Sequence, residues 1–84
     1  MIVQTFLELP AMYERILRHE SQTRRFTITS TSGSGWDVVD EEDGAARKDV
    51  RYLDWHRVER ARRAFAREAA ELRSRGWTEV RALS

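Results

Sequence analysis

The chain has no cysteine, one proline, a single lysine and no long run of apolar residues. The absence of cysteine excludes a disulfide framework and a thiolate nucleophile. No segment approaches the run of about 18 apolar residues that can cross a bilayer. Residues 1–10, MIVQTFLELP, lack the basic start and the long apolar core of a signal peptide. We therefore expect a soluble, cytoplasmic protein that contacts no membrane.

The chain also has little net charge. A formal charge of +1 is too small for the whole chain to act as a polycation toward nucleic acid. Residues 1–50 hold six basic and nine acidic side chains, a balance of −3, whereas residues 51–84 hold nine and five, a balance of +4. Lys48 is the single lysine, and all the other positively charged residues except the two histidines are arginine. The codon usage of a GC-rich genome also produces this bias.

A chain of 84 residues has room for one small domain, 1–84, with a single core. We treat residues 1–9 as an extended segment of uncertain state. Pro10 suits the first turn of a helix. Four apolar residues follow at helical spacing, namely Met12, Tyr13, Ile16 and Leu17. We therefore predict a short amphipathic helix over residues 10–19.

Three short strands are predicted in the middle of the chain. Residues 25–31 (RFTITST), 36–40 (WDVVD) and 46–53 (ARKDVRYL) each alternate apolar and polar side chains. Gly44 can adopt the positive φ that a tight turn after EED needs. These strands form an antiparallel meander with one apolar face. That face presents Phe26, Ile28, Trp36, Val38, Val50 and Tyr52.

A long C-terminal helix is predicted over residues 55–75. Asp54 is a good N-cap, and Gly76 suits the position that follows the last turn. This assignment places Leu72 and Trp77 at the two positions that touch in a Schellman motif. Five residues fall within an arc of about 80° on one side of the helix, namely Val58, Ala61, Phe65, Ala69 and Leu72.

The expected fold class is α+β. We expect a short N-terminal helix, a three-stranded antiparallel meander and a long C-terminal helix packed on one face of the sheet. Residues 78–84 are expected to be either a frayed tail or a short added strand.

The opposite side of the C-terminal helix carries a row of basic residues, which we call the arginine ridge. Its members, His56, Arg60, Arg63 and Arg67, fall within an arc of about 60°. Trp55 lies at the edge of the apolar stripe and is expected to be partly exposed. The candidate binding surface is therefore Trp55, His56, Arg60, Arg63 and Arg67.

Neighbouring acids are expected to neutralise part of the ridge. Three pairs have the i,i+4 spacing of helical ion pairs, namely Glu59–Arg63, Arg67–Glu71 and Glu71–Arg75. Arg60 has no acid three or four residues away and stacks on like charges. The ridge is thus either a solvated helix face without function or a surface for carboxylates or phosphates.

The favoured hypothesis is a small non-enzymatic binding module for a protein partner or a second copy of the chain. Residues 40–43 (DEED) are predicted to cluster at a hairpin tip, and their charge is complementary to the ridge. In a two-fold dimer each tip could meet a ridge. The alternative is a nucleic-acid-binding domain that contacts phosphates through the same ridge.

Motifs for chemistry are weak. TSGSG (31–35) leads into a strand and lacks the lysine of a phosphate-binding loop. A third hypothesis, a ribonuclease-like enzyme, would use His56 with Glu59 and Arg60 as acid–base groups. Because these residues lie on an exposed helix without a visible pocket, we expect no catalytic residue. His19 and His56 lack a third ligand, so no metal site, cofactor or small-molecule ligand is inferred.

Two resemblances to known families concern the architecture. The expected order helix–strand–strand–strand–helix is similar to that of double-stranded RNA-binding domains, although the stretch DWHRVERA lacks their Lys-Lys pair. The stretches GWDVV and RAFAREAAELRSRGW resemble the end of a WGR domain, in which a helix closes on glycine and an aromatic residue. The Trp-Gly-Arg tripeptide is missing, because Trp36 is followed by Asp37. Neither resemblance transfers a functional residue.

Overall fold

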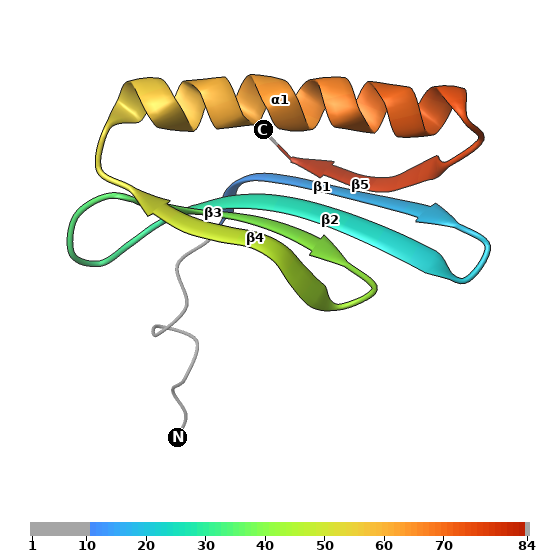
Figure 1. Ribbon diagram of the computed structural model, residues 1–84, viewed down its shortest axis with the longest axis horizontal. Helices are drawn as coiled ribbons and strands as arrows, with labels where there is room; N and C mark the ends of the chain where they lie inside the picture. The colour runs from blue at the N-terminus through green and yellow to red at the C-terminus, as the bar shows by residue number, and fades with distance from the viewer. Residues whose placement is uncertain (1–10, 84) are drawn as a thin grey trace.

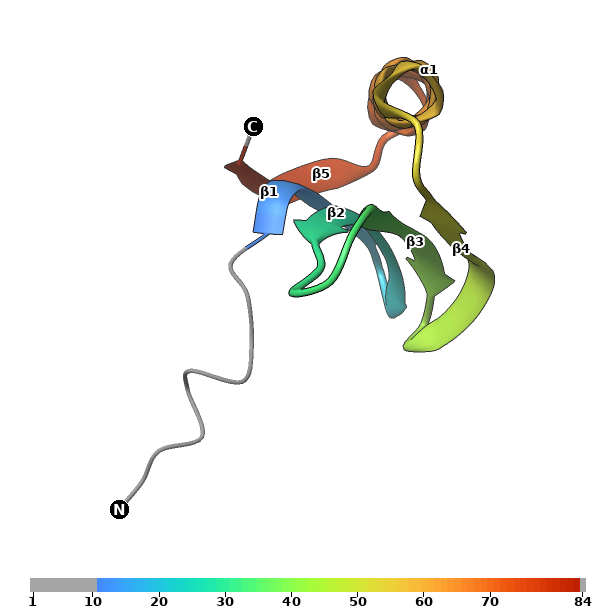
Figure 2. The same ribbon diagram turned by 90° about the vertical axis from the view of Figure 1, so that its left-hand side faces the viewer.

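The computed structural model describes residues 11–83, which form an antiparallel β-sheet with a long α-helix across it (Figure 1). The elements in chain order are β1 (Ala11–His19), β2 (Gln22–Ser30), β3 (Trp36–Glu42), β4 (Ala45–Tyr52), α1 (Trp55–Ser74) and β5 (Thr78–Leu83). Their order across the sheet is β4-β3-β2-β1-β5. The helix therefore carries the chain from one edge of the sheet to the other and covers one face (Figure 2).

The predicted N-terminal helix over residues 10–19 is wrong, because this part of the chain forms β1. β1 pairs with β2 on one side and with β5 on the other. Tyr13 and Leu17 face the helix and are 3% and 0% exposed, whereas Ile16 belongs to the opposite face and is only partly buried. Apolar residues at this spacing fit a helix and a strand equally well. The hydrogen bonds to two neighbouring strands decide the outcome.

The predicted three-stranded meander is also wrong, because the sheet has five strands. The three predicted strands correspond to β2, β3 and β4, and β1 and β5 extend the sheet beyond β2. For the C-terminal tail the strand alternative is confirmed over Thr78–Leu83. With a strand in place of the first helix, the likeness to double-stranded RNA-binding domains is lost. Pro10, the segment 1–9 and residue 84 lie outside the described residues.

The core lies between α1 and the sheet face that it covers. The Phe65 ring lies 4.8 Å from that of Phe26 and 6.3 Å from that of Tyr13, measured between centroids. All five residues of the predicted helix stripe are buried, and so are Phe26, Ile28 and Val38. Trp36 and Tyr52 pack against this core from its margin. No helix in the described part of the chain is long and apolar enough to cross a membrane.

The predicted C-terminal end of the helix is confirmed. The Trp77 N–H donates to the Leu72 carbonyl at 3.0 Å, and the Gly76 N–H donates to the Arg73 carbonyl at 3.1 Å. Gly76 has a φ of 100°, a region that costs glycine little and other residues more. These two bonds define a Schellman motif, which turns the chain from α1 into β5. The Trp77 ring then stacks on His19 at the end of β1.

Candidate binding surface

The five residues of the predicted surface all lie on α1, and all five are exposed. The buried residues of the helix lie on its opposite side, against the sheet, so the arginine ridge faces away from the core. From Arg60 to Arg67 the ridge extends along the helix axis by about 10 Å, at about 1.5 Å per residue. The four ridge residues thus share the solvent side of α1, and Trp55 is the first residue of the same helix.

The ridge is less neutralised than the sequence indicated. None of the three predicted i,i+4 pairs forms within 4.0 Å. Glu59 instead accepts hydrogen bonds from Arg62, at 3.0 Å and 3.3 Å, on the flank of the helix. These bonds hold the pKa of Glu59 below its usual value and raise the pKa of Arg62. Arg60, Arg63 and Arg67 have no carboxylate of the described residues within 4.0 Å.

Trp55 forms the N-terminal end of the candidate surface. Its side chain is 43% exposed, and its ring lies 5.2 Å from that of Trp36, tilted by 58°. Trp36 in turn packs against the core. Trp55 is therefore in contact with a ring that is itself fixed by the core, while part of its own surface remains in contact with solvent. A partly exposed tryptophan of this kind is a candidate for a protein-binding hot spot.

Asp54, two residues before His56, caps the start of α1. The Asp54 carboxylate accepts a hydrogen bond from the His56 backbone N–H at 3.0 Å, which is the N-cap bond that the sequence predicted. The Asp54 side chain therefore serves the helix end, and the exposed imidazole of His56 stands beside the ridge. The imidazole adds a hydrogen-bonding group to the candidate surface.

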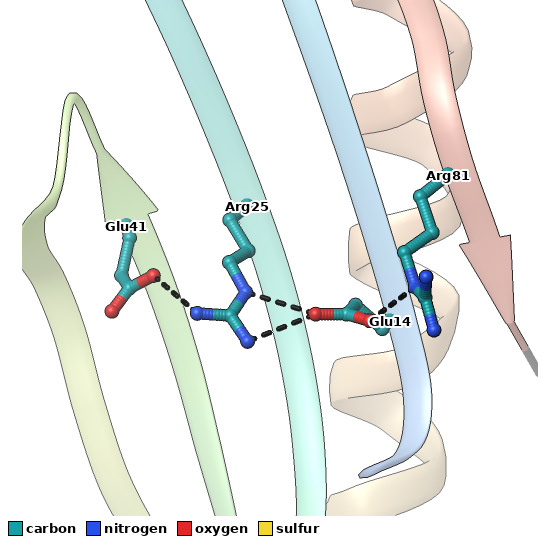
Figure 3. Close-up of polar contacts among 4 residues, drawn as sticks. All are labelled: Glu14, Arg25, Glu41 and Arg81. Carbon is teal, nitrogen blue, oxygen red and sulfur yellow. Dashed lines mark hydrogen bonds and ion pairs between the residues drawn. The ribbon is translucent and has the colours of Figure 1, made fainter.

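A polar network that the sequence did not predict lies on the sheet face that α1 leaves open. In Figure 3, Arg81, Glu14, Arg25 and Glu41 form a row across β5, β1, β2 and β3. The Glu14 carboxylate accepts bonds from Arg81 at 2.7 Å and from Arg25 at 3.0 Å, and Glu14 is only 8% exposed. We call these four residues the cross-strand network. Pairing of β1 with β2 makes Glu14 and Arg25 diagonal neighbours on one face of the sheet. A helix predicted over residues 10–19 gave no such neighbours.

The acidic run at residues 40–43 is used within the chain. Arg24 bonds to both Asp40 oxygens at 3.2 Å, and Arg25 contacts Glu41 at 3.5 Å. The other two members are also engaged, because Glu42 lies 3.6 Å from Arg47 and Asp43 accepts from the Thr23 N–H at 2.8 Å. The hairpin tip is therefore not a free acidic patch.

Comparison with known proteins gives no match, whether to a family model, to a curated protein or to a solved structure. The resemblance to WGR domains therefore stays limited to the helix end described above. Within residues 11–83, no group of three His, Asp or Glu side chains is placed to hold a metal ion.

Proposed function

We propose that this protein is a non-enzymatic binding module that takes an acidic protein segment on the exposed face of α1. One observation carries the proposal. Among the described residues, Arg60, Arg63 and Arg67 follow one another along the helix without a carboxylate partner, although nearly all of the sheet arginines are paired. The guanidinium group binds carboxylates through two parallel hydrogen bonds, so these donors suit glutamate and aspartate side chains.

Trp55 favours a protein over nucleic acid as the partner. Its ring packs against Trp36 at a tilt, and the residue remains 43% exposed. Tryptophan and arginine together are enriched among the residues that dominate protein–protein affinity. A net charge of +1 adds little of the long-range attraction that nucleic-acid binding uses. Binding of phosphates by the ridge remains the alternative.

The engaged acidic tip favours a different protein over a second copy. A dimer in which each tip meets a ridge would first have to break the contacts of Asp40 and Glu41 with their own arginines. A partner that brings unpaired carboxylates has no such cost. The proposal places the protein in the cytoplasm, and this location stays a prediction.

The test is a fluorescence anisotropy titration with two labelled probes. One is an amphipathic helical peptide with glutamates on one face and leucines on the next, and the other is a DNA duplex. Each is titrated at about 10 mM and about 150 mM salt, because exposed charges are screened over shorter distances at the higher value. Wild type is compared with Arg60→Glu/Arg63→Glu. The matched control is Arg18→Glu/Arg75→Glu, which makes the same change of charge at exposed arginines away from the ridge.

We expect the peptide to bind wild type and the control with similar affinity, and the ridge variant at least about tenfold more weakly. Equal weakening by both variants would mean a general charge effect and would contradict the proposal. Tight, steeply salt-dependent DNA binding that only the ridge variant loses would establish the alternative instead. Absence of binding to either probe at low salt would leave the ridge a solvated helix face.

A further inference from the structure

β5 has one edge without a neighbouring strand. It pairs with β1 on its inner side, whereas no strand of residues 11–83 pairs with its outer side (Figure 2). Such an edge presents backbone N–H and C=O groups with which a further strand can pair. The opposite edge strand, β4, exposes the charged side chains of Lys48 and Asp49, which discourage strand addition. Of the two edges, that of β5 is thus better suited to accept a strand.

An open hollow lies beside this edge, between the last turns of α1 and the start of β5. Its volume is about 620 Å³, and its lining consists of Ala70, Arg73, Ser74, Trp77, Thr78 and Glu79. All of these residues except Trp77 and Glu79 are exposed, so the hollow can be reached from solvent. A groove beside a free strand edge suits an extended peptide, whose backbone pairs with the edge while alternate side chains enter the groove.

Apolar side chains are exposed along the same edge. Val80 is the extra residue of a β-bulge, because Ile16 pairs with Arg81 and Leu17 pairs with Glu79. The Val80 residue is 50% exposed, and Leu83 at the end of β5 is 42% exposed. Together with Trp77 in the hollow, they offer contacts to apolar side chains of a partner.

The exposed charge beside the edge is positive. The side chains of Arg73 and Arg81 are 62% and 60% exposed. The carboxylate among them, that of Glu79, is only 14% exposed and is bonded to Arg15 on the inner side of β5. Arg73 approaches Glu79 only to 3.9 Å, beyond hydrogen-bond distance. A segment that carries carboxylates is therefore complementary to this edge, whereas a basic one is repelled.

We propose that the outer edge of β5 binds an extended acidic segment of another protein as a sixth strand. The backbone of the segment would pair with β5, its apolar side chains would contact Trp77 and Val80, and its carboxylates would face Arg73. β5 has six residues and a length of about 20 Å, so about six residues of the partner would pair. A second copy of the chain fits less well, because it brings the same exposed arginines. This edge is separate from the arginine ridge, so the proposal does not depend on the proposed function.

The experiment is an NMR titration of the full chain with the peptide acetyl-Glu-Glu-Val-Val-Glu-Glu-amide at about 10 mM salt. In an extended conformation each face of this peptide carries both glutamate and valine. We expect saturable shifts over residues 77–83 and slower hydrogen exchange of the outward N–H groups of β5 at saturation. The analogue with lysine in place of glutamate should bind at least about tenfold more weakly.

Two N-methylated forms of the peptide test the backbone pairing. One is methylated at the odd positions and the other at the even positions, and only one of these two sets of N–H groups can point toward β5. We expect one form to bind like the parent peptide and the other to lose binding. Equal binding by the two forms would overturn the proposal.

Ala70→Glu tests the hollow, because Ala70 is exposed in its lining and the substitution leaves the core unchanged. We expect about tenfold weaker binding, since the new carboxylate repels the acidic peptide. Ala64→Glu makes the same change at an exposed residue of α1 that does not line this hollow, and should leave binding unchanged.

Three further results would each overturn the proposal. They are absence of binding at low salt, equal weakening by the two variants, and binding that leaves the hydrogen exchange of β5 unchanged. Without peptide, exchange of the β5 amides should not depend on protein concentration. Exchange that slows as the concentration rises would show that a second copy occupies the edge, and would also contradict the proposal.

Discussion

The sheet and the helix of this protein use arginine in different ways. Of the seven arginines on the five strands, six have a carboxylate of the described residues within 4.0 Å, and Arg18 is the exception. Of the six arginines on α1, only Arg62 and Arg73 have one. A codon bias toward arginine would act on both regions alike, so composition alone does not explain the difference. It is the placement of the acids that differs.

The pairing on the sheet serves the fold. β5 adds little to the core, because its side chains are almost all exposed. It is tied to β1 by the Arg15–Glu79 and Glu14–Arg81 pairs. The bond from Arg15 lowers the pKa of Glu79, so this pair stabilises the fold above the usual glutamate pKa and is lost as the pH falls below it. Within residues 11–83, Arg60, Arg63 and Arg67 form no ion pair of this kind.

Both regions depend on one shared core, and the largest expected effect comes from opening it. Phe65→Ala removes the side chain that joins α1 to Phe26 and Tyr13, and should destabilise the protein by about 3–5 kcal/mol through the cavity it creates. Urea denaturation followed by tryptophan fluorescence measures this value. An unchanged denaturation midpoint would mean that the helix does not pack here.

Among the charged groups of the sheet, we expect those of the cross-strand network to cost the most stability when they are replaced. Glu14→Gln keeps the shape of the side chain but removes the charge that both Arg25 and Arg81 contact, which should cost about 1–3 kcal/mol. The same denaturation experiment tests it. If the variant were as stable as wild type, the pairing on the sheet would not serve the fold, and the contrast with the helix would disappear.

Gly76→Ala tests the turn that joins the two regions. An alanine at a φ of 100° should destabilise by about 1 kcal/mol, whereas Gly33→Ala, at a position with open space and no such φ, is the matched control. Thermal melts of both variants decide the matter. Equal melting temperatures would remove the conformational role assigned to Gly76.

The smallest effects come from one substitution made in both regions. Arg25→Gln deprives the buried Glu14 of one of its two partners and should cost about 1 kcal/mol. Arg63→Gln breaks no ion pair within the described residues and should change stability by less than about 0.5 kcal/mol. Equal losses of stability in the two variants would show that ridge and sheet arginines contribute equally to the stability of the fold.

The C-terminal half of the fold could be predicted from the sequence because its signals are local. Asp54, Gly76 and Trp77 mark the helix ends, and the spacing of Val58, Phe65 and Leu72 identifies the buried side. The β3–β4 hairpin could also be predicted, because its turn residues Asp43 and Gly44 both adopt the positive φ of a two-residue turn.

β1 could not be predicted because its signals are long-range. The β1–β2 turn places Glu20 at positive φ, a conformation that glutamate seldom adopts and that no glycine or asparagine announces here. β1 is also completed by β5, more than 60 residues away in the chain. Helical spacing placed the four residues of the arginine ridge on the exposed side of α1, as the structure has them. The missing i,i+4 pairs depend on side-chain rotamers, which spacing does not determine.

The most direct test of the central claim is the melting temperature of Arg60→Glu at low salt. If Arg60 does not serve the fold, reversing its charge relieves repulsion by Arg57 and Arg63 and creates attraction in its place. The gain of about 0.5–1 kcal/mol should raise the melting temperature by about 2–6 °C. A melting temperature below that of wild type would show that Arg60 supports the fold, and it would contradict the assignment of the ridge to a partner.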